Sequence, residues 1–186
     1  MQPPPGLKRV LIDADELAGR VHELGRQITG DYASREPVLV GVLTGAVVFL
    51  SDLMRAIDGP LRCEFIGVSS YGTSRQSSGI VKITADLASS IEGRDVLVVE
   101  DIIDTGRTIT YLKRNLETRH PRTVRVCTLL DKIERREVPV DLDYVGFTIP
   151  NEFVVGYGLD HAGLYRNLPY LAALDVGGPP AAPGRA

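Results

Sequence analysis

Three carboxylates lie close together in the sequence, next to a run of small polar residues. Glu100 and Asp101 follow the apolar run 96–99 directly, and Asp104 precedes a glycine, Gly106, by two residues. Apolar residues at helical spacing follow, so the segment is predicted to run from a buried strand through a loop into the N-terminus of a helix. Unpaired N–H groups at such a terminus attract phosphate, and a glycine lets a ligand approach the backbone closely.

Acids beside a phosphate site require a ligand that offers more than a phosphate. Bare carboxylates would repel phosphate, whereas sugar hydroxyls donate hydrogen bonds to carboxylates and Mg²⁺ binds them directly. The hydroxyls of Thr105 and Thr108 add further donors. A phosphorylated sugar with free hydroxyls and a metal-bound pyrophosphate meets all of these requirements. The alternative is an ordinary strand-to-helix turn with an aspartate as the helix N-cap.

Composition bounds the class of protein. The 186 residues are enough for one sizeable domain with a core, and a net charge of −3 predicts no broad basic face, so nucleic acid is not expected as the main partner. No apolar run is long enough to span a membrane, and the N-terminus lacks the core of a signal peptide. Cys63 and Cys127 lie in apolar runs and are expected to be buried free thiols of a cytoplasmic protein.

Apolar runs and helical patterns alternate along the chain. Strands are expected at 8–12, 37–43, 63–70, 80–84, 96–99, 124–130 and 144–148, and helices at 14–29, where Gly30 should end the helix, at 46–57, and after 108. This alternation predicts a single α/β domain over 8–176, with a mostly parallel sheet flanked by helices, and flexible tails at 1–7 and 177–186. Ligands of such sheets bind beyond the carboxyl ends of the strands.

The segment 98–108 resembles the phosphoribosyl-pyrophosphate loop of type I phosphoribosyltransferases, in which an acid pair precedes Ile-Ile-Asp-Thr-Gly. The resemblance extends from about residue 8 to about residue 176 and is most specific to the 6-oxopurine branch, the hypoxanthine–guanine phosphoribosyltransferases. It is also carried by Leu43-Thr44-Gly45, Ser70-Tyr71, the segment 129–132, and the segments 145–150 and 153–160.

The resemblance implies a purine salvage reaction: hypoxanthine or guanine and phosphoribosyl pyrophosphate give IMP or GMP and pyrophosphate, with Mg²⁺ as cofactor. It implies that Asp104 is the catalytic base. It assigns the ribose and its 5′-phosphate to Glu100, Asp101, Asp104, Thr105, Gly106, Arg107 and Thr108. It also implies a small base-binding hood formed by the terminal segments, and a homodimer or homotetramer.

The remaining roles follow from the same resemblance. The resemblance assigns pyrophosphate binding to Thr44, Gly45 and Arg166, and it places Ser70 and Tyr71 in a mobile loop that closes over the site. It assigns purine binding to Lys132, Phe153, Val154 and Asp160. It assigns metal binding to Glu100, Asp101 and Asp160. Many relatives have a basic residue in place of Thr44, so the side-chain part of its role stays open. The sequence does not decide whether the Leu43–Thr44 peptide is cis.

Other interpretations remain open. The chain is alternatively a xanthine-preferring relative, or a regulator that senses phosphoribosyl pyrophosphate without catalysis. A dinucleotide-binding fold is disfavoured because no G-x-G-x-x-G run follows a strand. Taken alone, Lys132 reads as a surface lysine at a strand end, and Arg135-Arg136 is predicted to be a solvated turn.

Overall fold

The central sheet has six strands in the order β4-β3-β2-β5-β6-β7, in a computed structural model that describes residues 6–70 and 81–175. Its pairs are parallel except for β3 with β4, which is antiparallel. The elements are β1 Leu7–Ile12, α1 Ala14–Asp31, β2 Val38–Leu43, α2 Val47–Ala56, β3 Arg62–Ser70, β4 Val81–Ala85, β5 Asp95–Ile103, α3 Arg107–Glu117, β6 Thr123–Asp131, the 3₁₀ turn η1 Ile133–Arg135, β7 Tyr144–Thr148, β8 Val154–Val155 and β9 Leu171–Leu174.

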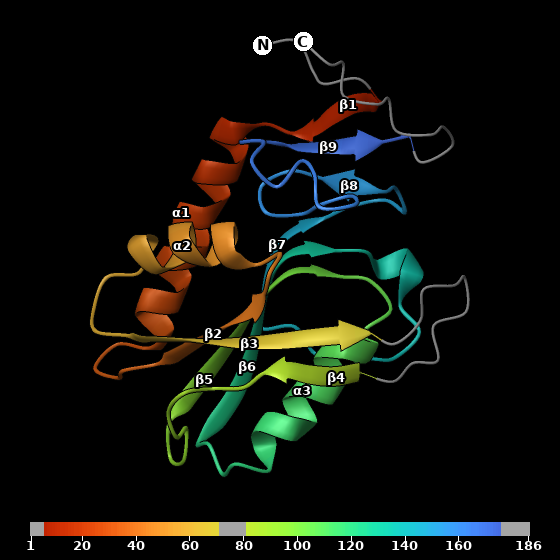
Figure 1. Ribbon diagram of the computed structural model, residues 1–186. Helices are drawn as coiled ribbons and strands as arrows, with labels where there is room; N and C mark the ends of the chain where they lie inside the picture. The colour runs from red at the N-terminus through yellow and green to blue at the C-terminus, as the bar shows by residue number, and fades with distance from the viewer. Residues whose placement is uncertain (1–5, 71–80, 176–186) are drawn as a thin grey trace, which may run out of the picture.

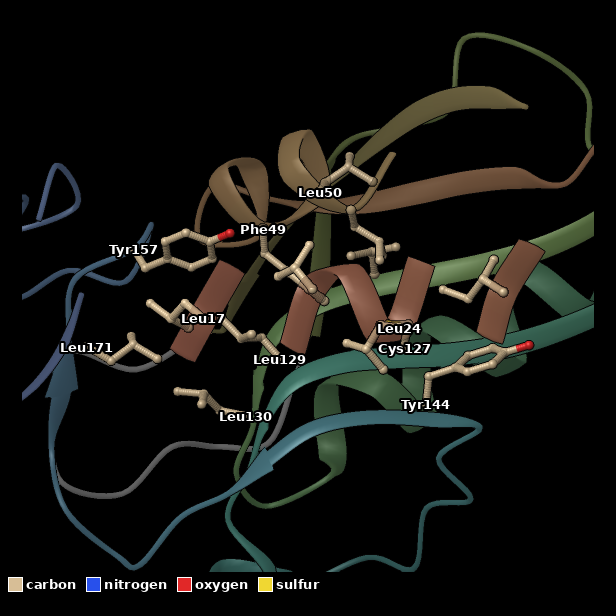
Figure 2. Packing of buried hydrophobic residues seen from close by; sticks show 14 of the residues in the cluster. Leu17, Leu24, Phe49, Leu50, Cys127, Leu129, Leu130, Tyr144, Tyr157 and Leu171 are labelled. Carbon is tan, nitrogen blue, oxygen red and sulfur yellow. The ribbon is translucent and has the colours of Figure 1, made fainter. Parts of the chain in front are cut away.

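Helices cover both faces of this sheet (Figure 1). Successive residues of β5 point to opposite faces: Leu97 packs into a core with α1 and α2, whereas Val96 and Val98 pack into a second core with α3. The apolar run 96–99 is therefore buried on both sides, as expected for a central parallel strand. Figure 2 shows the first core, in which Leu17 and Leu24 of α1 meet Phe49 and Leu50 of α2 above Leu129 of β6.

A second, three-stranded antiparallel sheet has the order β1-β9-β8. It joins the first strand of the chain to two late ones, and it lies beside the carboxyl ends of the central strands (Figure 1). The prediction of one α/β domain with a small hood formed by the terminal segments is confirmed. Among the described helices, none combines the length and apolar character needed to cross a membrane.

The structure corrects several expectations. β5 does not stop at residue 99 but continues through the acids to Ile103. α1 runs past Gly30 to Asp31, because the buried Tyr32 follows as its C-cap. Leu7, expected in the N-terminal tail, pairs with Leu174 in the hood sheet. Cys63 is exposed on β3, whereas Cys127 is buried as predicted.

The packing of α1 on α2 yields a prediction at Gly25. A Cβ placed there would overlap the carbonyl oxygen of Ala56 and lie 2.6 Å from the Ala56 Cβ, whereas nothing lies within 4 Å of a Cβ at Gly19 in the same helix. We expect Gly25→Ala to lower the free energy of unfolding by about 1–3 kcal/mol, because the two helices must separate. Gly19→Ala should raise it by up to about 1 kcal/mol through helix propensity.

Urea unfolding of both variants, followed by circular dichroism, measures the difference. Equal effects of the two alanines would contradict the close helix contact at Gly25.

Candidate active site

A cleft of about 450 Å³ opens where the carboxyl ends of β2 and β5 face the hood. Four separate parts of the chain line it: the end of β2 with the turn after it, Val68 of β3, the end of β5, and the connection between β8 and β9. The residues that the sequence assigned to pyrophosphate and to the metal all lie along it, namely Thr44, Gly45, Glu100, Asp101, Asp160 and Arg166. The fold therefore brings these predicted site residues together.

The acid pair lies at the end of β5, with Glu100 buried and Asp101 partly exposed. Only 6% of Glu100 is exposed, and loss of hydration raises its pKa well above the ordinary range, with a further contribution from the charge of Asp101. Burial likewise raises the pKa of Asp101 to about 6, although the Ile102 N–H donates to its Oδ1 at 2.8 Å and opposes the shift. Two buried carboxylates with raised pKa values are prepared to bind a cation or hydroxyl donors.

The pair fits a magnesium ion that brings other ligands with it. Among the described residues, no group of three or more His, Cys, Asp or Glu side chains gathers into a metal site. Mg²⁺ is commonly bound by one or two carboxylates together with water and substrate phosphates, rather than by a complete protein cage. Glu100 and Asp101 supply the carboxylates that such a site requires.

The turn after β2 packs tightly against both neighbours. The Leu43–Thr44 peptide is cis. A Cβ at Gly45 would overlap the carboxylate of Asp101, and a Cβ at Gly158, which has φ +102°, would overlap the carbonyl oxygen of Gly45. Glycine at both positions is therefore needed to bring the turn, the acid pair and the hood into contact.

The loop after β5 encloses a smaller hollow of about 90 Å³, lined by residues 102–106, Thr108 and Ile109 together with Glu100. Gly106 is the N-cap of α3 in the left-handed conformation, with φ +85°, and as a glycine it supplies no capping side chain. The alternative of an aspartate N-cap is thus wrong. The Arg107 N–H makes only a long contact, 3.4 Å, with the Thr105 hydroxyl. The first turn of α3 therefore borders a hollow of suitable size for a phosphate.

Lys132 lies at the carboxyl end of the neighbouring strand β6. Its N–H donates to the Ile103 carbonyl at 3.0 Å, which ties the ends of the two strands together. Only 8% of the residue is exposed, so the interpretation as a surface lysine is wrong. Burial lowers the pKa of its ammonium, while Asp104 opposes the shift and Arg135 adds to it. The lysine and the predicted base are therefore electrostatic neighbours.

The hood supplies the last group of predicted residues. Phe153 is 41% exposed, and its ring makes an edge-to-face contact with His161, with centroids 5.2 Å apart. Val154 is buried in β8. Asp160 pairs with Arg166 at 2.6 Å, and Arg166 also donates to the Gly158 carbonyl at 2.6 Å. The two residues assigned to metal and pyrophosphate therefore bind each other in the hood.

Sequence reasoning did not assign Arg135 and Arg136 to the site. It did assign Ser70 and Tyr71, for which the structure gives little detail. Arg135 lies in an exposed turn as expected, but it also donates to Asp104 at 3.0 Å. Arg136 pairs with Asp131 and is largely buried, so the expectation of a solvated residue is wrong for Arg136. The signal available in the sequence was that both arginines follow Lys132 within four residues, near several acids. Ser70 ends β3, and Tyr71 lies outside the described residues.

Comparisons with known proteins agree with this geometry. The phosphoribosyl transferase domain model matches residues 11–162. The hypoxanthine-guanine phosphoribosyltransferase of Mycobacterium avium is 52% identical over 178 residues, covering 92% of this chain and 88% of that protein. The bifunctional protein TilS/HprT of Listeria innocua is 54% identical over 90% of this chain, which spans only 26% of that longer protein.

The fold agrees as well. The Trypanosoma cruzi hypoxanthine phosphoribosyltransferase, solved in complex with the product IMP, superposes with a TM-score of 0.86 at 40% identity, covering 95% of this chain and 98% of that one. The predicted family and fold are thereby confirmed. The chain belongs to the phosphoribosyl transferase family, among proteins named hypoxanthine-guanine phosphoribosyltransferases.

Proposed function

We propose that this protein transfers the phosphoribosyl group of phosphoribosyl pyrophosphate to hypoxanthine or guanine, giving IMP or GMP and pyrophosphate. The observation that carries the proposal is the common location of three kinds of group. An acid pair whose Glu100 is buried, a helix N-terminus with glycine as its N-cap and a buried lysine all lie at the carboxyl ends of two neighbouring strands, β5 and β6. These groups suit a ribose diol, a 5′-phosphate and a purine oxygen, respectively.

Each chemical group of phosphoribosyl pyrophosphate, the phosphoribosyl donor, has matching residues in the site. Glu100 and Asp101 would accept hydrogen bonds from the ribose hydroxyls and hold Mg²⁺, with Asp160 contributing to a metal through water. The N–H groups of 105–108 and the hydroxyls of Thr105 and Thr108 would bind the 5′-phosphate. Thr44, Gly45 and Arg166 would bind the pyrophosphate. When bound, Mg²⁺ would neutralise charge on the leaving pyrophosphate.

The acceptor base would lie between Lys132 and the hood. Lys132 would donate to the purine 6-oxo oxygen, Phe153 would stack on the ring, and Val154 would offer its backbone to the base edge. As N9 of the purine bonds to C1′ of the ribose, the bond from C1′ to the pyrophosphate oxygen breaks and its electron pair leaves with the pyrophosphate. The proton on N7 would pass to the carboxylate of Asp104. Closure of Ser70-Tyr71 would exclude water from the cationic transition state.

We also infer that the protein works in the cytoplasm as a homodimer or homotetramer. Both cysteines are free thiols, which suits a reducing compartment, and the oligomer follows from the family resemblance.

A steady-state assay with phosphoribosyl pyrophosphate and Mg²⁺ tests the proposed activity, with hypoxanthine, guanine, xanthine and uracil as separate acceptors. We expect turnover with hypoxanthine or guanine and little with uracil. A clear preference for xanthine would identify a xanthine-preferring relative. Binding of phosphoribosyl pyrophosphate without turnover of any base would favour the regulator.

Replacing Lys132 should separate the two substrates. Lys132→Ala removes the donor to the purine oxygen, and a hydrogen bond from a charged group contributes about 1.5–3 kcal/mol, so we expect KM for hypoxanthine to rise about ten- to a hundredfold. The dissociation constant for phosphoribosyl pyrophosphate should change little in calorimetry. Lys113→Ala, on α3, is the matched control. Equal losses for both substrates would show that Lys132 does not face the base.

The raised pKa of the acid pair predicts a pH dependence of donor binding. Below about pH 6 the free enzyme keeps a proton on Asp101, and that proton must leave before Mg²⁺ or the diol binds to the carboxylate. KM for phosphoribosyl pyrophosphate should therefore rise as the pH falls, by up to about tenfold per unit below the pKa. Initial rates between about pH 5 and about pH 8 measure this. Asp101→Asn should flatten the profile, and an unchanged slope in that variant would contradict the assignment.

A further inference from the structure

The segment 133–138, which follows Lys132, packs against the loop 104–108 that is proposed to bind the 5′-phosphate. The N–H groups of Glu137 and Val138 both donate to the Thr105 carbonyl, at 3.0 and 3.1 Å. Gly106 packs so closely that a Cβ there would lie 2.7 Å from the Val138 carbonyl oxygen. The 3₁₀ turn Ile133–Arg135 lies between these contacts and Lys132, so its backbone is held relative to the loop.

One of those side chains binds the proposed catalytic base. The Arg135 Nε–H donates to Oδ1 of Asp104 at 3.0 Å, which leaves Oδ2 free. The side chains of Arg135 and Asp104 are 46% and 41% exposed, and such half-exposed ion pairs contribute little to stability. A role in folding therefore does not account for this contact.

The position of Asp104 creates a problem that this contact solves. An aspartate directly before a helix N-terminus readily accepts hydrogen bonds from N–H groups two or three residues ahead. Here those N–H groups belong to Gly106, which lines the hollow proposed for the 5′-phosphate, and to Arg107, whose N–H makes a long contact of 3.4 Å with the Thr105 hydroxyl. A carboxylate that capped them would compete with the phosphate. In the structure the N-cap of α3 is Gly106, which has no side-chain oxygen to offer, and the Asp104 carboxylate accepts a hydrogen bond from Arg135 instead.

We propose that Arg135 is a positioning residue that holds the Asp104 carboxylate away from the phosphate-binding N–H groups and aims its free oxygen at the purine. The inference rests on the proposed function. Its first consequence is better donor binding, because the phosphate meets no competing carboxylate. Its second is faster chemistry, because the base is already oriented when the purine binds. The charged groups facing Asp104 from the neighbouring strand and turn are Lys132 and Arg135.

A double-mutant cycle tests the first consequence with binding alone. Calorimetry with Mg²⁺ and phosphoribosyl pyrophosphate compares wild type, Arg135→Ala, Asp104→Ala and the double variant. We expect Arg135→Ala to weaken binding about tenfold, the size usual for coupled neighbouring groups. Asp104→Ala should bind at least as tightly as wild type, and the double variant should match Asp104→Ala. Arg119→Ala, which removes the Arg119–Asp86 pair, is the control and should not change binding.

Kinetics test the second consequence. Arg135→Ala should lower kcat, because the base is less well oriented once the purine is bound. Arg135→Lys keeps a cation beside Asp104 and should restore part of kcat. A loss of kcat that Arg135→Lys does not restore would contradict the orienting role.

Two results would overturn the inference. The first is that Arg135→Ala weakens binding equally with and without Asp104, which would mean that Arg135 acts on the ligand directly. The second is that Arg135→Ala changes neither binding nor kcat. Failure of the proposed function looks different. Wild type would then bind the donor but turn over no purine, and the binding cycle would still report on Arg135.

Discussion

The burial of β5 on both faces is the constraint on which the site depends. Because the run 96–99 packs into a core on either side, the strand cannot slide or rotate without moving buried side chains out of both cores. Pairing with β6 continues from Asp95 to Ile103, past the end of the apolar run. Glu100 and Asp101 are therefore presented on a rigid ladder rather than on a loop, and their burial follows from the strand that carries them.

The rigid strand holds the two acids at a position where burial disfavours their ionised form. Burial raises the pKa of both carboxyl groups. Their desolvation is a cost of folding that a bound cation or a pair of hydroxyl donors would offset. The turn at Gly45 packs against the Asp101 carboxylate, and the hood turn at Gly158 packs against Gly45. The fold itself therefore makes the acid pair a site for a cation or for hydroxyl donors.

The fold was largely predictable because its central strands are short apolar runs between polar turns. The buried strands 38–43 and 123–131 and the glycine loop after residue 103 are recognisable in the sequence by composition alone. The end of β5 was not, since polar residues usually mark a loop; pairing of Glu100 with Thr128 and of Ile103 with Asp131 keeps the backbone extended. Cys63 was expected to be buried, but its side of β3 is left open, as the exposed Phe65 also shows.

The side chains around Asp104 were predictable in part. The resemblance named Asp104 and Lys132, which lie together. It did not name Arg135, whose partner is 31 residues earlier in the chain. Ion pairs of this kind depend on how the ends of two strands meet, and a one-dimensional pattern contains no such information.

The hood has a consequence for how the molecule is made. Its first strand, Leu7–Ile12, pairs with Leu171–Leu174. During synthesis β1 leaves the ribosome well before its partner β9, because β2 to β7 all lie between the two in the chain. The central sheet can therefore assemble before the hood sheet closes beside its carboxyl ends. A nascent chain is thus able to shape the strand ends that line the cleft well before the hood that faces them is complete.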